Sequence, residues 1–429
     1  MTAGLAACSS DNTENLGQIG AVSGFLGGVV ADEPRAVRIA RDVLSAGGTA
    51  ADAAVALYAT MTVTKSSVAG IGGGGVCVVH DRQSKKVEVL DFWPRPGTRT
   101  ADSQTATTIP GVPRGLYALS ARYGRLQWPQ LLSAAEQYAR LGVPVSRSMV
   151  DDIEANRDRI EASPILRDVF MPDGNTLQVG DRIRSVNLGA LLTSLRVKGP
   201  GEFYNGALGA QIATAVQNAG GTLTAEDMRD YKPQWKSATE VKVGNETLYL
   251  AYPPRAESGR AVIDASTELG AVLNRYLADI DAADSNVQSN TGRSGFVVLD
   301  RAANAVACMT TMNKPFGAGL GADAFGLNLA AGDAGYAQTP LMGPALMVNP
   351  FVFEYYYGIA GTGTPAGATK QIATMAEDLI EKGAAANVPM NSDGKPAVNI
   401  VRCLEGTPPH PESCQFIADP AGGGMAGTQ

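Results

Sequence analysis

The sequence predicts an α+β fold, an αββα sandwich in which two mainly antiparallel sheets lie between layers of helices. Short apolar runs come in pairs joined by polar turns, at residues 76–92 and 296–309, which is typical of β-hairpins. Helical patterns cluster before and after these pairs and do not alternate with single strands, so parallel βαβ units are not expected. A chain of 429 residues with 45% hydrophobic residues can bury a large core.

Capping residues mark the first helices. Residues 32–34, Asp-Glu-Pro, open a helix that ends at Gly47-Gly48. Thr49 begins a second helix that is apolar almost all round, so we expect it to be buried. A glycine run then leads into a strand at 76–80. Because this run joins a helix to a strand, we interpret it as a tight turn and not as a phosphate-binding loop.

The middle of the chain is mainly helical, and the last third mixes strands and helices. Helices are expected at 116–123, 128–141, 149–167, 187–195, 208–219, 225–231, 258–278 and 369–381. Strands are expected at 235–252 and 347–359, and a flexible tail at 420–429.

Charge and hydropathy exclude two classes of partner. The formal net charge is -7, whereas a nucleic-acid-binding protein needs a basic surface. No uninterrupted apolar segment reaches the length of a membrane span. No cofactor is expected, and His80 and His410 have no evident partners for a Ser-His-Asp hydrolase.

The N-terminus resembles the lipobox of bacterial lipoproteins. Residues 5–8 read Leu-Ala-Ala-Cys and are followed by a polar stretch that could serve as a tether. We therefore expect Cys8 to be lipidated and the protein to be exported, periplasmic or membrane-anchored, with the chain starting too late to include a full leader. The alternative is a small-residue tail with an idle cysteine.

The other cysteines divide into two pairs. Cys77 and Cys308 lie in apolar runs and are expected to be buried thiols. Cys403 and Cys414 enclose a proline-rich loop and predict a local disulfide in an oxidising compartment. A zinc site would need four ligands and only His410 is near, so no metal is expected.

A threonine before a buried strand suggests a catalytic nucleophile. Thr291 follows a polar segment and precedes the apolar run from Phe296 to Leu299. If the chain cleaves itself just before such a threonine, the freed amine has a pKa of about 8 and can accept the hydroxyl proton. The alternative is an ordinary turn before a strand.

Several segments together resemble the γ-glutamyltransferase (glutathione hydrolase) family, in the same order as in that family. They begin near Gly27 and extend to the C-terminus. The segments are GGVVADEPRAVRIARDVLSAGGTAADAAVALYA, SSVAGIGGGGVCVVHD, IPGVPRGL, RYGRLQWPQLLSAAEQYARLGVPVS, FYNG…GGTLTAEDMRDY, YPPRAESG and FVVLDRAANAVACMTTMN. The resemblance implies the αββα sandwich of N-terminal-nucleophile hydrolases and a proenzyme that cleaves itself. It also implies γ-glutamyl transfer through an acyl-enzyme to water, an amino acid or a peptide.

The resemblance also assigns residues and boundaries. We expect residues 1–20 to be the lipobox-like N-terminus and tether, 21–290 a large-subunit-like region and 291–429 a small-subunit-like region, the last two being parts of one domain. If the chain is cleaved, the two fragments are expected to stay associated. Thr291 is the expected nucleophile, Thr311 matches the threonine that hydrogen-bonds it, and Asn313 matches a residue that binds the α-amino or carboxylate end of the substrate. The block 363–368 resembles the loop whose backbone amides form the oxyanion hole, here Ala366 and Gly367.

The sequence departs from the family at four places. When the family pattern is aligned at Asp300 and counted backwards, its nucleophile position falls on Arg293. Thr291 takes that position only if the turn contains two extra residues. Ser294, the residue after Arg293, is the alternative hydroxyl. The family's Asp-Phe-Arg motif is replaced by a segment in which Arg95 either binds the substrate carboxylate or is a surface residue. An acidic block is replaced by residues 326–335, and the Ser-Ser that precedes Met-Ser-Pro is absent from 340–344.

Three functions follow as hypotheses. The first is a self-processing γ-glutamyltransferase-like enzyme that acts on glutathione-like amides. The second keeps this chemistry but takes a different acyl donor, as an amide acylase. The third is a non-catalytic lipoprotein that keeps the fold as a binding module; Arg293 and the missing acids favour it, whereas Thr311 and Asn313 favour an enzyme.

Overall fold

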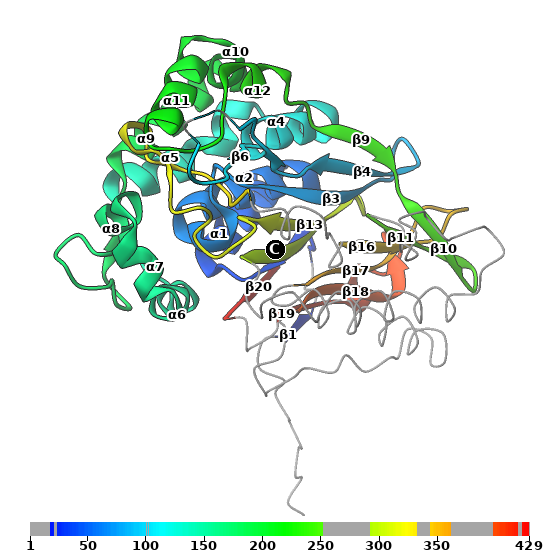
Figure 1. Cartoon of the computed structure of the whole chain (residues 1–429). Coiled ribbons are helices and arrows are strands. Elements are labelled where there is room, and N and C mark those ends of the chain that lie inside the picture. The colour runs from blue at the N-terminus through cyan, green and yellow to red at the C-terminus, as the bar shows by residue number, and fades with distance from the viewer. Residues whose placement is uncertain are drawn as a thin grey trace, which may run out of the picture.

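A computed structural model gives the fold of this protein (Figure 1). It describes residues 18–20, 24–99, 101, 103–251, 292–332, 344–361, 398–418 and 423–428. Two seven-stranded antiparallel sheets pack face to face, and helices gather on the outer face of one of them. The α+β class and the antiparallel sheets agree with the sequence prediction. The expected helices at 258–278 and 369–381, together with Cys8, lie outside the described residues.

The sheet under the helices, called here the central sheet, has the strand order β20-β2-β12-β13-β3-β4-β9. All of its neighbouring strands are antiparallel. Its strands in chain order are β2 (Gly27–Ala31), β3 (Gly74–Asp81), β4 (Lys86–Phe92), β9 (Gln234–Ser237), β12 (Arg293–Asp300), β13 (Ala305–Thr311) and β20 (Met425–Thr428). The 420–429 prediction was wrong in part, because residues 425–428 pair with β2.

The hairpin of β12 and β13 occupies the middle of the central sheet. Every residue of both strands is buried, so each strand packs on two faces. Asp300 organises the turn: its carboxylate accepts hydrogen bonds from the Asn304 backbone and side chain. The same carboxylate accepts the Ala50 N–H at 3.0 Å, and so stabilises the N-terminus of the buried helix α2 (Ala50–Thr64).

The second sheet has the order β1-β19-β18-β17-β16-β11-β10. Its strands in chain order are β1 (Gln18–Gly20), β10 (Thr239–Val243), β11 (Glu246–Leu250), β16 (Ala345–Val348), β17 (Tyr355–Gly361), β18 (Val398–Thr407) and β19 (Cys414–Ala418). The strand expected at 347–359 is therefore two strands. An apolar cluster that includes Val297, Leu346 and Phe416 fills the space between the sheets.

The helices cover the outer face of the central sheet, where Phe296 and Val298 join the larger apolar cluster. They are α1 (Pro34–Ser45), α2, α3 (Ser66–Ala69), α4 (Val112–Tyr123), α5 (Trp128–Leu141), α6 (Arg147–Ala155), α7 (Arg157–Ala162), α8 (Pro164–Phe170), α9 (Val186–Lys198), α10 (Pro200–Asn205), α11 (Ala207–Asn218) and α12 (Ala225–Asp230). The sequence prediction missed α10, because its Gly-Pro start resembles a loop. Among the described residues no helix is long and apolar enough to cross a bilayer.

Short pairings tie the loops together. They are β5 (Arg95–Pro96) with β6 (Thr108–Ile109), β7 (Val143–Pro144) with β8 (Arg182–Ile183), and β14 (Gly321–Ala322) with β15 (Leu327–Asn328). Two 3₁₀ turns, η1 (Asp323–Phe325) and η3 (Pro411–Ser413), complete the described elements.

Two disulfides cross-link adjacent strands. Cys403 and Cys414 form the local pair across β18 and β19. Cys77 and Cys308 are also joined, with a Cα–Cα distance of 4.1 Å, because the register of β3 and β13 places them directly opposite each other. The prediction of two buried thiols at these positions was wrong. This second disulfide links residues on either side of the expected cleavage point.

We expect the two disulfides to differ in their contribution to stability. The pair Cys77–Cys308 spans 231 residues and Cys403–Cys414 spans 11. Replacing both cysteines of the longer pair by alanine should lower the free energy of unfolding by about 3 kcal/mol more than the same change in the shorter pair. Urea unfolding of uncleaved protein measures this difference, and non-reducing peptide mapping checks the pairing. Equal losses, or free thiols at Cys77 and Cys308, would contradict the prediction.

Candidate functional site

The first residues of β12 present different side chains to the two faces of the central sheet. Further along the strand, Val297 packs between the sheets and Phe296 packs under the helices. Because side chains alternate along a strand, Arg293 falls on the face between the sheets and Ser294 on the face toward the helices. Both residues are buried, with exposures of 5% and 0%. Two neighbours at the expected nucleophile position therefore occupy opposite faces.

Thr311 and Asn313 lie together at the end of β13. Thr311 pairs directly with Arg293 across the hairpin, and it shares the face between the sheets. The backbone N–H of Asn313 donates to Thr311 Oγ1 at 2.8 Å, and Asn313 Nδ2 donates to the carbonyl of Ala331 at 2.7 Å. The second bond fixes the amide orientation, because a carbonyl can accept only from the NH₂ group. Asn313 Oδ1 accepts a hydrogen bond from the Thr311 hydroxyl, with the two oxygens 3.5 Å apart.

Gly292 fixes the chain where it enters β12. Its φ is 59°, and a Cβ at this position would lie 2.2 Å from the backbone carbon of Lys314. Only glycine fits so close an approach. The Met312 N–H also donates to the Gly292 carbonyl at 2.9 Å. The residue after Thr291 is thus held against the loop that carries Asn313, whereas Thr291 itself, Ala366 and Gly367 lie outside the described residues.

Two arginines border this region through aromatic contacts. The Arg293 guanidinium lies over the ring of Trp93, with its Cζ 5.3 Å from the ring centre. Arg95 is half-buried and lies over Tyr231 at 5.5 Å, and the Tyr231 hydroxyl donates to the Trp93 carbonyl at 3.1 Å. These cation–π contacts hold positive charge beside the start of β12. The expectation that Arg95 is either a substrate ligand or a surface residue stays open.

A buried carboxylate holds Ser294. Its hydroxyl donates to Asp32 Oδ2 at 2.7 Å. Asn399 Nδ2 donates to Asp32 Oδ1 at 2.8 Å and to the Gly295 carbonyl at 2.7 Å. Asp32 follows β2, Ser294 lies in β12 and Asn399 lies in β18. One carboxylate therefore connects the helix side of the central sheet to the second sheet.

The charges around Asp32 are also buried. Burial raises the pKa of Asp32 to about 6, while hydrogen bonds from Ser294 and Asn399 act in the opposite direction. The charge of Lys65 also lowers the pKa of Asp32, whereas the charge of Asp152 raises it. Lys65 and Asp152 form an ion pair with an N–O distance of 2.9 Å. Burial likewise raises the pKa of the neighbouring Glu33. The sequence prediction treated residues 32–34 only as a helix start; the helix cap is Glu33, which leaves Asp32 for this contact.

The sequence profile of the family described as gamma-glutamyltranspeptidase matches residues 36–269. This chain belongs to that family. Glutathione hydrolase 3 of Arabidopsis thaliana is 33% identical over 261 residues, covering 58% of this chain and 41% of the plant protein. The glutathione hydrolase proenzyme of Bacillus subtilis is 30% identical over 223 residues, covering 48% of this chain and 38% of that protein. The chain thus spans about two fifths of the length of these relatives.

Solved structures extend the likeness in fold to almost the whole chain. A cephalosporin acylase from Bacillus halodurans superposes with a TM-score of 0.74 and 18% identity over 99% of both chains. The gamma-glutamyltranspeptidase of Helicobacter pylori gives a TM-score of 0.50 and 23% identity over 63% of this chain and 78% of that one. The family member therefore has the fold of N-terminal-nucleophile hydrolases.

Sequence reasoning missed three residues that shape this site. Asp32 was predicted only as part of a helix start, and nothing in the linear sequence connects it with Asn399, 367 residues away. Gly292 was not singled out, although a glycine directly before a buried strand is a signal of close backbone approach.

Within the described parts of the chain no group of His, Cys, Asp and Glu side chains is suited to a metal ion.

The pKa of Asp32 predicts a pH dependence of stability. The pKa is 3.8 in an ordinary setting and about 6 in the fold, so the folded protein binds the proton more tightly. This contribution to stability is complete below pH 3.8 and is lost as the pH rises through about 6. Relative to Asp32→Asn, the free energy of unfolding of the parent should fall by about 3 kcal/mol across this range.

Urea unfolding at a series of pH values measures the effect. Asp42→Asn on the surface of α1 serves as the control and should keep the pH profile of the parent. Ser294→Ala removes a donor to the carboxylate and should shift the profile toward higher pH. Identical profiles for the parent and Asp32→Asn would refute the assignment.

Proposed function

We propose that this protein transfers or hydrolyses a γ-glutamyl group, or a similar acyl group, of small amides through an acyl-threonine intermediate. The single observation that carries this proposal is the arrangement of Thr311 and Asn313 beside Gly292, at the start of β12. Membership of the gamma-glutamyltranspeptidase family supports the chemistry, since curated relatives are glutathione hydrolases. The acyl donor and the self-processing are part of the proposal.

The proposed nucleophile is Thr291, freed as an N-terminus when the preceding peptide bond is cleaved. Its hydroxyl oxygen attacks the amide carbonyl while its amine accepts the hydroxyl proton. The backbone N–H groups of Ala366 and Gly367 are the proposed donors to the resulting oxyanion. The C–N bond then breaks, the departing amine takes the proton, and water or an acceptor amine attacks the ester to release the acyl group.

The orientation of Asn313 indicates which end of the substrate it binds. One N–H of its Nδ2 is engaged by the Ala331 carbonyl, which turns Oδ1 toward Thr311, and Oδ1 keeps a lone pair for a second donor. An acceptor suits the α-ammonium group of a γ-glutamyl substrate and not its carboxylate. Arg293 and Arg95 supply the positive charge that the α-carboxylate would require. Thr311 Oγ1 accepts the Asn313 N–H and donates its own proton to Asn313 Oδ1 over 3.5 Å, so the two residues hold each other in place.

The disulfide Cys77–Cys308 bears on the proposed cleavage. Cys77 lies in the large-subunit-like region and Cys308 in the small-subunit-like region. After cleavage before Thr291 the two fragments would therefore stay covalently joined. The contact of Asp32 with Ser294 and Asn399 would hold them together as well.

A second function, that of a non-catalytic binding module, is favoured by Arg293. The residue directly across from Thr311 is a buried arginine stacked on Trp93, at the position where the family pattern places its nucleophile. A chain that remains uncut and binds an anionic small molecule would fit this reading. Ser294, the alternative hydroxyl, is bound to Asp32 on the opposite face of the sheet, which favours Thr291 as the nucleophile.

We expect Thr291→Ala to abolish turnover of a γ-glutamyl anilide. Loss of the attacking oxygen should lower kcat/KM by about 10³-fold or more. Thr291→Ser keeps a hydroxyl and should retain measurable turnover, and Ser294→Ala should retain it because its hydroxyl is engaged elsewhere. Steady-state release of the aniline measures all three variants. Turnover that survives Thr291→Ala and disappears in Ser294→Ala would overturn the assignment.

Asn313 can be tested by comparing two substrates. A γ-glutamyl anilide carries the α-ammonium group, and the matching glutaryl anilide lacks it. Asn313→Gly removes the amide and tolerates the φ of 62°. The parent should prefer the γ-glutamyl substrate, and the variant should lose about tenfold or more of that preference in kcat/KM, since hydrogen bonds to charged groups contribute about 1.5–3 kcal/mol. An unchanged preference would exclude this role.

A further inference from the structure

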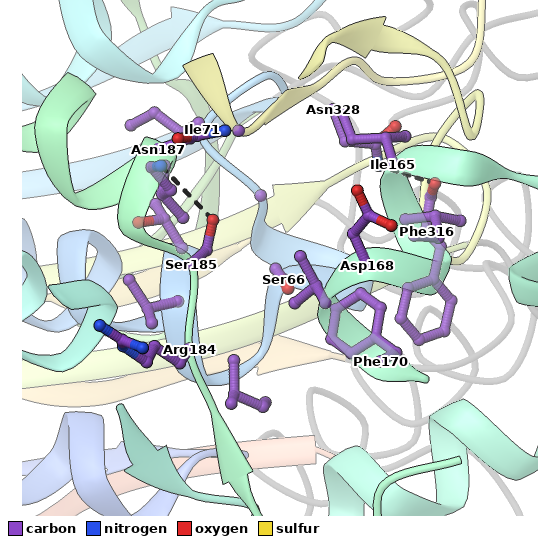
Figure 2. A pocket seen from close by; sticks show the side chains of 18 of the residues that line it. Ser66, Ile71, Ile165, Asp168, Phe170, Arg184, Ser185, Asn187, Phe316 and Asn328 are labelled. Carbon is purple, nitrogen blue, oxygen red and sulfur yellow. Dashed lines mark hydrogen bonds between the residues drawn. The ribbon is translucent and has the colours of Figure 1, made fainter. Parts of the chain in front are cut away.

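A cavity of about 240 Å³ lies on the helix side of the central sheet, away from the face that carries Thr311. It is enclosed by the end of α2, by α8, by the start of α9 and by the loop that follows β13 (Figure 2). A dry cavity of about 150 Å³ suffices to hold benzene. This cavity therefore has room for a single ring with a short chain.

Much of the cavity wall is apolar, and this part is formed by Val63, Ile165, Phe170, Met312 and Phe316. Polar groups of Ser66, Ser185 and Asn187 line the rest of the wall. The rings of Phe170 and Phe316 meet edge to face with their centres 5.1 Å apart. Such a lining favours an apolar body, which gains free energy on leaving water.

The charged groups around the cavity are mainly acidic. Asp168 and Asp323 both line it, both are exposed, and neither carboxylate forms an ion pair within the described parts of the chain. Figure 2 shows Asp168 projecting into the space between Ser66 and Phe316. Arg184 also lines the cavity, but its Nε donates to the Arg140 carbonyl at 3.0 Å and its guanidinium points away from the centre of the view.

From this combination we infer that the cavity is a binding site for a small organic cation with an apolar body, such as an arylalkylamine. The body packs against the apolar part of the cavity wall, and the ammonium group faces Asp168 and Asp323. The site is separate from the proposed acyl-transfer site, but the two share one loop: Met312 lines the cavity, and the next residue is Asn313. The inference does not depend on the proposed function, because it concerns binding alone.

The test uses 2-phenylethylamine and its neutral counterpart 2-phenylethanol as probes on the full chain. Binding is measured by calorimetry and localised by the NMR signal of the Met312 methyl group, assigned through Met312→Leu. The amine should bind about fivefold or more tightly than the alcohol, as an exposed ion pair allows, and should shift the Met312 signal. Equal affinities, or an unmoved Met312 signal, would overturn the inference.

Substitutions test the charge of the cavity and its shape separately. The double change Asp168→Asn and Asp323→Asn should remove the preference for the amine, and Asp173→Asn, an exposed acid that does not line the cavity, should keep it. Val169→Phe places a ring at the half-buried wall and should weaken both probes. A preference that persists in the double variant would contradict the inference. Because the acids are exposed, these changes test it even if Val169→Phe fails to fold.

Discussion

The register of the hairpin formed by β12 and β13 decides the chemistry available at this site. The hairpin is buried on both faces, so a shift by one residue would move every apolar side chain to the wrong face of the central sheet. With the register fixed, Arg293 stands opposite Thr311 and Ser294 stands opposite Thr310. The hydroxyl of Ser294 is thereby directed toward the helices, where it meets Asp32. Thr311 is directed toward the other sheet.

The same register determines how the two halves of the chain are held together. It brings Cys77 and Cys308 opposite each other, although they are far apart in sequence. It also places the Ser294 hydroxyl within hydrogen-bonding distance of Asp32. The carbonyl of the next residue, Gly295, accepts a hydrogen bond from Asn399 on the second sheet. A carboxylate with so little exposure is costly to ionise, and two donors offset part of that cost. Cleavage near residue 291 would leave all of these contacts in place.

Much of this architecture follows from local patterns in the sequence. Paired apolar runs predicted the hairpins at 76–92 and 296–309, and Thr49 predicted the helix that it caps. The order of the helical and strand patterns suggested the layered arrangement, and the family resemblance implied the same arrangement. Patterns that are complete within a few residues are readable because they depend only on propensity and capping.

What escaped prediction depends on partners far along the chain. The strand β20 has small residues without apolar alternation, and only its pairing with β2 makes it a strand. The pairing of Cys77 requires knowledge of strand order. The role of Asp32 requires the approach of three separate elements, and no spacing in the sequence reveals it.

The most direct test is the intact mass and N-terminal sequence of the purified protein after prolonged incubation, with and without a reducing agent. We expect two polypeptides under reducing conditions, the smaller beginning at Thr291, and a single joined species without reduction because Cys77–Cys308 spans the cut. A single uncut polypeptide under reducing conditions would contradict acyl transfer by Thr291 and would support the binding module. A smaller fragment beginning at Ser294 would contradict the assignment of Thr291.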